Sequence, residues 1–190
     1  PITPVDPATH HWFVGDAMVH GVRLAEGHAD WYRARMVRST RVSEALGEAP
    51  VPGERHADME TANTNVVGVG GKTLAIVEAG ARPVELSYEL DTLRHTDLGG
   101  LPHGYTAHPK VDPATGDLHA ISYHWAIPHL EYSVIGADGT VKQVSPVAVD
   151  GGPMVHDCSI TERWTVVYDL PVTFDLDIAM AAAGFPYTWD

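Results

Sequence analysis

Two histidines in short, distinctive segments are the residues of this chain best suited to chemistry. His108 lies in residues 106–113, TAHPKVDP, and His156 lies in residues 154–157, MVHD, 48 positions further along. Neutral imidazole is a good ligand for iron(II) and related metal ions. A spacing of about 40–50 residues is typical of propeller blades, each of which brings an equivalent inner-strand position to one central axis. We therefore predict that the two imidazoles face each other as part of a metal site.

Glu78 is the candidate support for a metal-bound histidine. It follows the apolar run Leu74-Ala75-Ile76-Val77, where a carboxylate is costly unless it is paired. A ligating imidazole commonly donates its other N–H to a carboxylate, which fixes the tautomer and raises the basicity of the metal-bound nitrogen. The competing interpretation is an exposed carboxylate at the end of a strand.

The other histidines are numerous but poorly spaced for a metal site. Because neighbouring members of the series His119, His124 and His129 are five residues apart, they point to opposite faces of an extended chain. A zinc site would instead need Cys and His at short spacings that feed a tetrahedron. We interpret these three residues, together with His95 and His103, as solvated or strand-packed imidazoles.

Other catalytic signatures do not occur in the sequence. It has no G-x-S-x-G motif for a nucleophilic serine and no phosphate-binding G-x-x-x-x-G-K-[ST] motif. The glycines at 68, 70 and 71 precede a second strand rather than a helix, which favours a hairpin over a dinucleotide site. Cys158 is interpreted as a small buried residue rather than a reactive thiol, and Asp157 as a residue that holds its loop.

Composition narrows the classes of function. The 190 residues carry a net charge of −13 with only 12 Lys and Arg, which disfavours a nucleic-acid partner because phosphate binding needs clustered basic residues. A single cysteine cannot form an internal disulfide, and no apolar run has the length of a membrane span. The cytoplasm is the expected location. Because the chain begins at Pro1 and stops after an aromatic run, we expect residues 1–190 to be a single domain truncated at both ends.

The elements that must position these residues are mainly antiparallel strands. Short runs rich in Val, Ile, Thr and Tyr alternate with Gly, Pro and Asp turns, which favours an all-β fold. A first hairpin, formed by 11–23 and 29–38, is expected to turn at Glu26-Gly27. The other predicted strands are 65–69, 73–78, 83–89, 117–124, 129–135, 141–149, 155–160 and 164–169. One short helix is expected at 176–183 with Asp175 and Gly184 as caps, and 42–59 is expected to be a polar loop. Strand spacing alone permits either a sandwich or a propeller.

The motifs around His108 and His156 resemble those of the carotenoid cleavage oxygenase family. The resemblance implies the N-terminal blades of an incomplete seven-bladed propeller whose iron is held by four histidines. His108 and His156 match two of those ligands, and the other two are expected beyond residue 190. Glu78, after the Asn63-Thr64-Asn65 segment, matches a glutamate that supports an iron-bound histidine of another blade. Its partner histidine is expected to be absent from this chain.

The resemblance implies a non-haem iron(II) dioxygenase that uses O₂ to split a conjugated double bond of a hydrophobic polyene into two carbonyl products. In the stilbene-cleaving branch a lysine precedes the glutamate, whereas this chain has Val77, which favours a carotenoid or apocarotenoid substrate. Stilbene cleavage and a zinc hydrolase remain alternatives. As a further alternative, the 190-residue chain by itself is an inert, poorly soluble propeller fragment that binds metal weakly. Peripheral membrane contact and the oligomeric state stay open.

Overall fold

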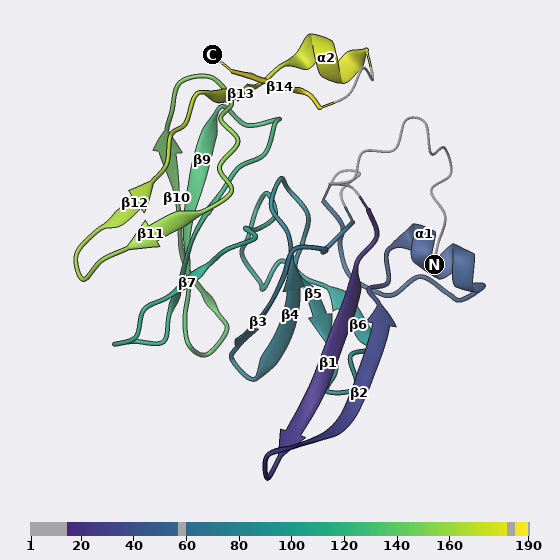
Figure 1. Cartoon of the computed structure of the whole chain (residues 1–190). Helices are drawn as coiled ribbons and strands as arrows, with labels where there is room; N and C mark the ends of the chain where they lie inside the picture. The colour runs from purple at the N-terminus through teal and green to yellow at the C-terminus, as the bar shows by residue number, and fades with distance from the viewer. Residues whose placement is uncertain (1–14, 57–59, 182–184, 190) are drawn as a thin grey trace.

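The computed structural model describes residues 15–56, 60–181 and 185–189, which are mostly antiparallel β-sheet with two short helices. Two four-stranded sheets form its centre, with strand orders β3-β4-β5-β6 and β10-β9-β8-β7 (Figure 1). Three two-stranded hairpins, β1-β2, β11-β12 and β13-β14, complete the sheet structure. Sequential strands that pair as neighbours form the meander expected of propeller blades.

The strands agree with the predicted pattern where hydrophobic alternation is strong. β3 and β9 have the predicted bounds, and β4, β5, β8, β10, β11 and β12 lie within a residue of, or inside, the predicted ranges. The strands are β1 (Met18–Ala25), β2 (His28–Met36), β3 (Asn65–Val69), β4 (Lys72–Ile76), β5 (Val84–Leu86), β6 (Thr92–His95), β7 (Lys110–Val111), β8 (Leu118–Ser122), β9 (His129–Ile135), β10 (Val141–Ala148), β11 (Cys158–Ile160), β12 (Thr165–Val167), β13 (Val172–Phe174) and β14 (Tyr187–Trp189).

Tight turns set the register of the hairpins. Glu26 and Gly27 both have positive φ, 50° and 79°, and join β1 to β2. Gly70 and Gly71, with φ of 57° and 72°, join β3 to β4, where Val69 pairs with Lys72. A two-residue turn with positive φ at both positions matches the right-handed twist of the strands it connects.

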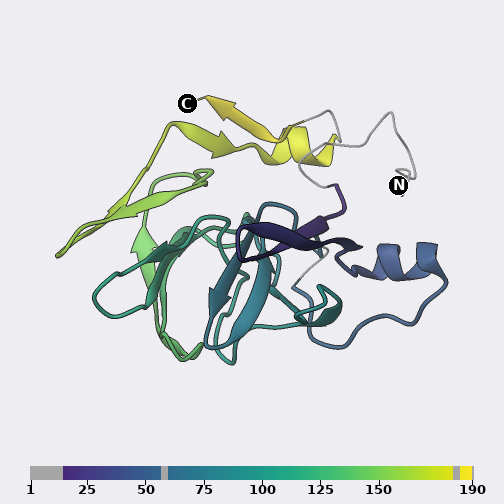
Figure 2. The ribbon, with the colours of Figure 1, turned by 60° about the horizontal axis from the view of Figure 1, so that its bottom comes forward.

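Three hydrophobic clusters lie between neighbouring sheets, and Figure 2 shows the ribbon of these sheets from a second side. The first packs β3 and β4 against β8 and β9 through Leu74, Ile76, Leu118 and Ile135. The second packs Val19 of β1 and Val37, just after β2, onto β4 and β5, and the third joins β8 and β9 to the segments around β11, β12 and β14. The core is therefore a series of layers between adjacent sheets, which gives each strand end a defined position.

The helical predictions were partly wrong. α1 (Thr40–Leu46) begins just before the region 42–59 that was predicted to be a polar loop and occupies its first five residues, 42–46. Ser39 caps it by accepting a hydrogen bond from Val42 N, Val42 is fully buried, and Gly47 ends it with φ of 68°. The loop prediction relied on prolines that lie beyond this helix. α2 (Leu176–Met180) has Asp175 as its predicted N-cap, whereas the predicted cap Gly184 lies outside the described residues.

Four of the described strands were not predicted, and the start of β1 was predicted too early in the sequence. β6, β7, β13 and β14 have two to four residues each, too few for a periodic pattern. The first strand was predicted to begin at residue 11, but β1 begins at Met18, and residues 15–17 before it are not in a strand. Residues 11–14 of that prediction lie outside the described residues. Among the described residues, no helix is long and apolar enough to cross a membrane.

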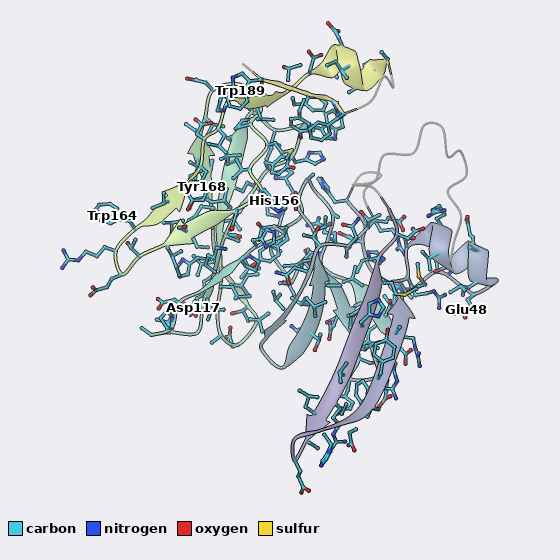
Figure 3. All side chains as sticks on the ribbon, viewed as in Figure 1. Glu48, Asp117, His156, Trp164, Tyr168 and Trp189 are labelled. Carbon is cyan, nitrogen blue, oxygen red and sulfur yellow. The ribbon has the colours of Figure 1, made fainter. Side chains whose placement is uncertain are left out.

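The C-terminal hairpins expose large apolar side chains. Trp164 in the β11–β12 turn is 73% exposed and Trp189 at the end of β14 is 78% exposed (Figure 3). Tyr168, Leu170 and Met180 are also exposed. Exposed apolar surface of this kind drives association. These side chains support the prediction that the isolated chain is poorly soluble, and that prediction is untested.

Candidate metal centre

The structure brings His108 and His156 together. Each lies in a loop just before a short strand, His108 before β7 and His156 before β11, and these two strands lie against each other. The Nε2 atoms are 2.9 Å apart and the ring centroids 4.4 Å apart. His156 lies near the middle of the molecule, on the side of the β11–β12 hairpin opposite its Trp164 tip (Figure 3). Two residues 48 positions apart in the sequence thus present their ring nitrogens to one point.

Glu78 lies behind His156. Its Oε1 atom is 2.7 Å from Nδ1 of His156. A carboxylate can only accept, so Nδ1 carries the proton and Nε2 of neutral His156 directs its lone pair toward His108. The expectation that the partner of Glu78 is absent from this chain was therefore wrong, because sequence order does not show which blades lie side by side.

The donor set fits part of a metal site. Metal–nitrogen distances of about 2.1 Å place two adjacent ligands of one ion roughly 3 Å apart, close to the separation of the two Nε2 atoms. Glu78 supplies the carboxylate that commonly orients a ligating imidazole. Within the described ranges, no group of three or more His, Cys, Asp or Glu side chains could enclose an ion. The residues present therefore account for two ligands and one supporting carboxylate.

The loops that carry the two histidines are tied down by polar contacts. Asn65 at the start of β3 donates from Nδ2 to the carbonyl of Ala107, 3.0 Å away. Lys110 Nζ lies 2.7 Å from Asp157 Oδ1, which also accepts from the backbone N of Cys158. These contacts confirm that Asp157 holds its loop. The role of Asn65 was missed, although its position in the Asn-Thr-Asn segment offered a signal.

The electrostatics around these loops favour a charged Asp157 and a protonated Cys158. Partial burial opposes ionisation of Asp157, but its hydrogen bonds with Lys110 and Cys158 N outweigh burial and hold the carboxyl pKa below its usual value. Burial raises the pKa of the Cys158 thiol, and the side chain packs with Tyr123 and Val155. Cys158 is thus a buried filler, as predicted.

The remaining described histidines lie elsewhere, as predicted. His95 is buried with Nε2 3.1 Å from the carbonyl of Arg38, and His119 Nδ1 lies 2.6 Å from the hydroxyl of Tyr132. His103, with a side chain that is 35% exposed, and the buried His124 also contact another imidazole, which was not predicted. They lie with His56 in a cluster whose ring centroids are 4.7 Å (His56–His124) and 5.7 Å (His56–His103) apart.

The buried ring of His124 predicts an acid-sensitive step in stability. Burial, together with the neighbouring His56 and His103, lowers its pKa from 6.5 to about 4. Between these values the unfolded chain binds a proton that the folded chain does not, so stability falls as the pH is lowered through this window, by up to about 1.4 kcal/mol per pH unit. Between pH 7 and pH 5 we expect the melting temperature of the full-length His124→Asn variant to drop less than that of the wild type. Asn is chosen because its side-chain oxygen can still accept the hydrogen bond from Ala126 N. An equal drop in both proteins would contradict this assignment.

Comparison with known proteins shows the family of this chain. The whole chain, residues 1–190, matches the family described as retinal pigment epithelial membrane protein. It is 53% identical over 181 residues to the carotenoid cleavage oxygenase of Mycobacterium tuberculosis, a match covering 92% of this chain and 36% of the relative. It is 33% identical to carotenoid 9,10(9',10')-cleavage dioxygenase 1 of Arabidopsis thaliana, over 88% of this chain and 37% of that protein.

A solved structure shows the same fold. The lignostilbene dioxygenase of Pseudomonas brassicacearum superposes with a TM-score of 0.79 at 30% identity, over 94% of this chain and 40% of that enzyme. The chain thus spans little more than a third of the length of these relatives, and its sheets are part of a larger propeller. The chain belongs to the retinal pigment epithelial membrane protein family, which is the carotenoid cleavage oxygenase family that its histidine motifs predicted.

Proposed function

We propose that the full-length protein is a non-haem iron(II) dioxygenase that splits a conjugated carbon–carbon double bond of a carotenoid or apocarotenoid into two carbonyl products. The observation that carries this proposal is the convergence of the Nε2 atoms of His108 and His156, 2.9 Å apart, with Glu78 bonded to the far side of His156. Membership of a family that includes a carotenoid cleavage oxygenase at 53% identity supports it.

Each residue of the centre has a distinct role in this proposal. His108 and His156 would hold the iron, with two further ligands supplied by the remainder of the full-length protein. Iron(II), when bound there, supplies the activation of molecular oxygen. Glu78 keeps the Nδ1 proton of His156 in place, so that Nε2 remains free as a ligand. Asn65 and the Lys110–Asp157 pair hold the two loops at the required separation.

The position before Glu78 bears on the substrate. Val77 is apolar and 7% exposed, so it offers no charge that would bind a phenolic oxygen. In the stilbene-cleaving branch of the family that the sequence resembles, a lysine occupies this place. An apolar side chain suits a hydrocarbon polyene. Cleavage of a stilbene is the second candidate, and similarity to the lignostilbene dioxygenase favours it.

Product analysis separates the candidates. We expect the iron-loaded full-length protein, incubated in air, to consume O₂ and form aldehydes from a carotenoid or an apocarotenal, and to leave a hydroxylated stilbene largely intact. Chromatography of the products and an oxygen electrode provide the measurement, with an anaerobic sample as control. Turnover of the stilbene alone would establish the second candidate, and hydrolytic turnover with stoichiometric zinc would overturn both.

The isolated 190-residue chain is expected to be inactive. Two imidazoles do not select iron(II), which binds more weakly than most later divalent ions of its row. Selectivity depends on a complete ligand geometry, and at this centre the described residues supply two converging imidazoles with one carboxylate behind them.

A further inference from the structure

The turn that follows Glu78 is conformationally unusual. β4 ends at Ile76, so the sheet does not itself fix the Glu78 carboxylate. Ala79 and Gly80 then adopt positive φ angles of 64° and 105°. The left-handed region is unfavourable for a residue with a Cβ, so surrounding structure must hold Ala79 in it. The placement of Glu78 against His156 therefore depends on what holds this turn.

Three groups enclose Gly80. His56 Nδ1 lies 2.9 Å from the Gly80 carbonyl, which can only accept, so the ring donates. The ring of His124 lies against Gly80 on another side, since a Cβ added there would be 2.3 Å from His124 Cδ2. Gly104 approaches the Gly80 backbone so closely that a Cβ at position 104 would be 2.4 Å from the Gly80 carbonyl carbon. The backbone at Gly80 has little freedom to move.

The imidazoles around the turn are themselves fixed. His103, whose ring lies beside His56, has Nδ1 2.8 Å from Oε1 of the buried Glu131 on β9. His124 is 5% exposed and accepts through Nδ1 from the backbone N of Ala126. We refer to His56, His103 and His124 as the imidazole clamp. It joins the turn after Glu78 to β9 and to the loop that precedes His56.

We propose that the imidazole clamp positions Glu78: by holding the Gly80 carbonyl and the left-handed turn at Ala79–Gly80, it sets the carboxylate against Nδ1 of His156. His56 is the principal positioning residue, because it makes the direct hydrogen bond to the turn. This inference rests on the proposed role of Glu78 and His156 in the metal centre, and adds residues that touch neither the metal nor the substrate.

Cobalt(II) binding to the full-length protein tests the clamp. We expect His56→Leu to raise the Co²⁺ dissociation constant about tenfold, the low end of the effect of losing an outer support of a metal ligand, and to change the visible spectrum of bound Co²⁺. His56→Asn should restore most of the affinity, because its amide nitrogen can take the place of Nδ1. His119→Leu is the matched control, since it removes a half-buried ring bonded to Tyr132 rather than to the turn.

The outcomes separate this inference from the proposed function. An unchanged dissociation constant in His56→Leu, or an equal rise in His119→Leu, overturns the clamp. If His56→Leu does not fold, His56→Gln replaces it as the test variant. The amide nitrogen of Gln reaches the place of Nε2 rather than that of Nδ1, which makes the hydrogen bond to Gly80. The inference therefore requires His56→Gln to bind Co²⁺ more weakly than His56→Asn does. Should His156→Ala bind Co²⁺ as tightly as the wild type, the metal centre itself is wrong. If His156→Ala loses Co²⁺ binding while the His56 variants bind Co²⁺ as tightly as the wild type, the imidazole clamp is wrong and the metal centre stands.

Discussion

His156→Ala in the full-length protein is expected to lose bound iron and to lower alkene cleavage more than about 100-fold, beyond the loss typical when only a supporting partner of a ligand is removed. The substitution deletes the ring that, among the described residues, contacts both His108 and Glu78. Because the His156 side chain is about half exposed in this chain, its removal leaves no large cavity here. Iron content and the initial rate with an apocarotenal provide the measurement.

His129→Ala is the matched control for that substitution. His129 begins β9 and pairs with Ala148 of β10, so it lies on a strand rather than in either of the loops that carry His108 and His156. It should retain iron and activity near the wild-type level, and both variants should express comparably. Cleavage by His156→Ala at a rate close to that of the wild type would show that the ligand assignment is wrong.

Glu78→Gln is expected to weaken metal binding about 10- to 100-fold without destabilising the metal-free protein. The amide oxygen can still accept from Nδ1 of His156, but the negative charge that raises the basicity of the ring is lost. In the metal-free protein the wild-type carboxylate is largely buried, and its Oε2 has no hydrogen-bond partner among the described residues. Replacing a buried charge of this kind with a neutral group relieves a desolvation cost.

Affinity and stability should therefore change in opposite directions for Glu78→Gln. Competition with a chelator measures the metal dissociation constant, and thermal melting of the metal-free protein measures stability. Glu78→Ala extends the series, because it leaves the Nδ1 proton of His156 without its acceptor and should bind metal more weakly than Glu78→Gln. A fall in the melting temperature of metal-free Glu78→Gln that parallels its loss of affinity would indicate a structural role instead.

Local chemistry made much of the fold predictable. The Glu26-Gly27 and Gly70-Gly71 turns and the alternating residues of β3 and β9 are short-range signals, and the structure confirms them. The helix α1 was missed although Ser39 and Gly47 are good caps, because the prolines after it dominated the interpretation. The two residues of β7 carry too few positions for a pattern.

The candidate site was predictable only in part, for a physical reason. The residue types and contexts of His108, His156 and Glu78 marked them as candidates for a metal site, since a motif is a local property of the chain. The pairing of Glu78 with His156 is decided by the packing of β4 against β8 and of β8 and β9 against β11, through clusters whose members are far apart in sequence. The same holds for the His56 contact with Gly80 across 24 positions.

The sequence by itself therefore determined the family, the all-β character and the identity of the two candidate ligands. The tertiary structure decided which side chains meet: His108 with His156, His156 with Glu78, and His56 with the turn behind Glu78. Backbone turns and strand periodicity arise from neighbouring residues, whereas these contacts arise from burial of apolar surface between sheets. That burial depends on the three-dimensional arrangement of the whole chain.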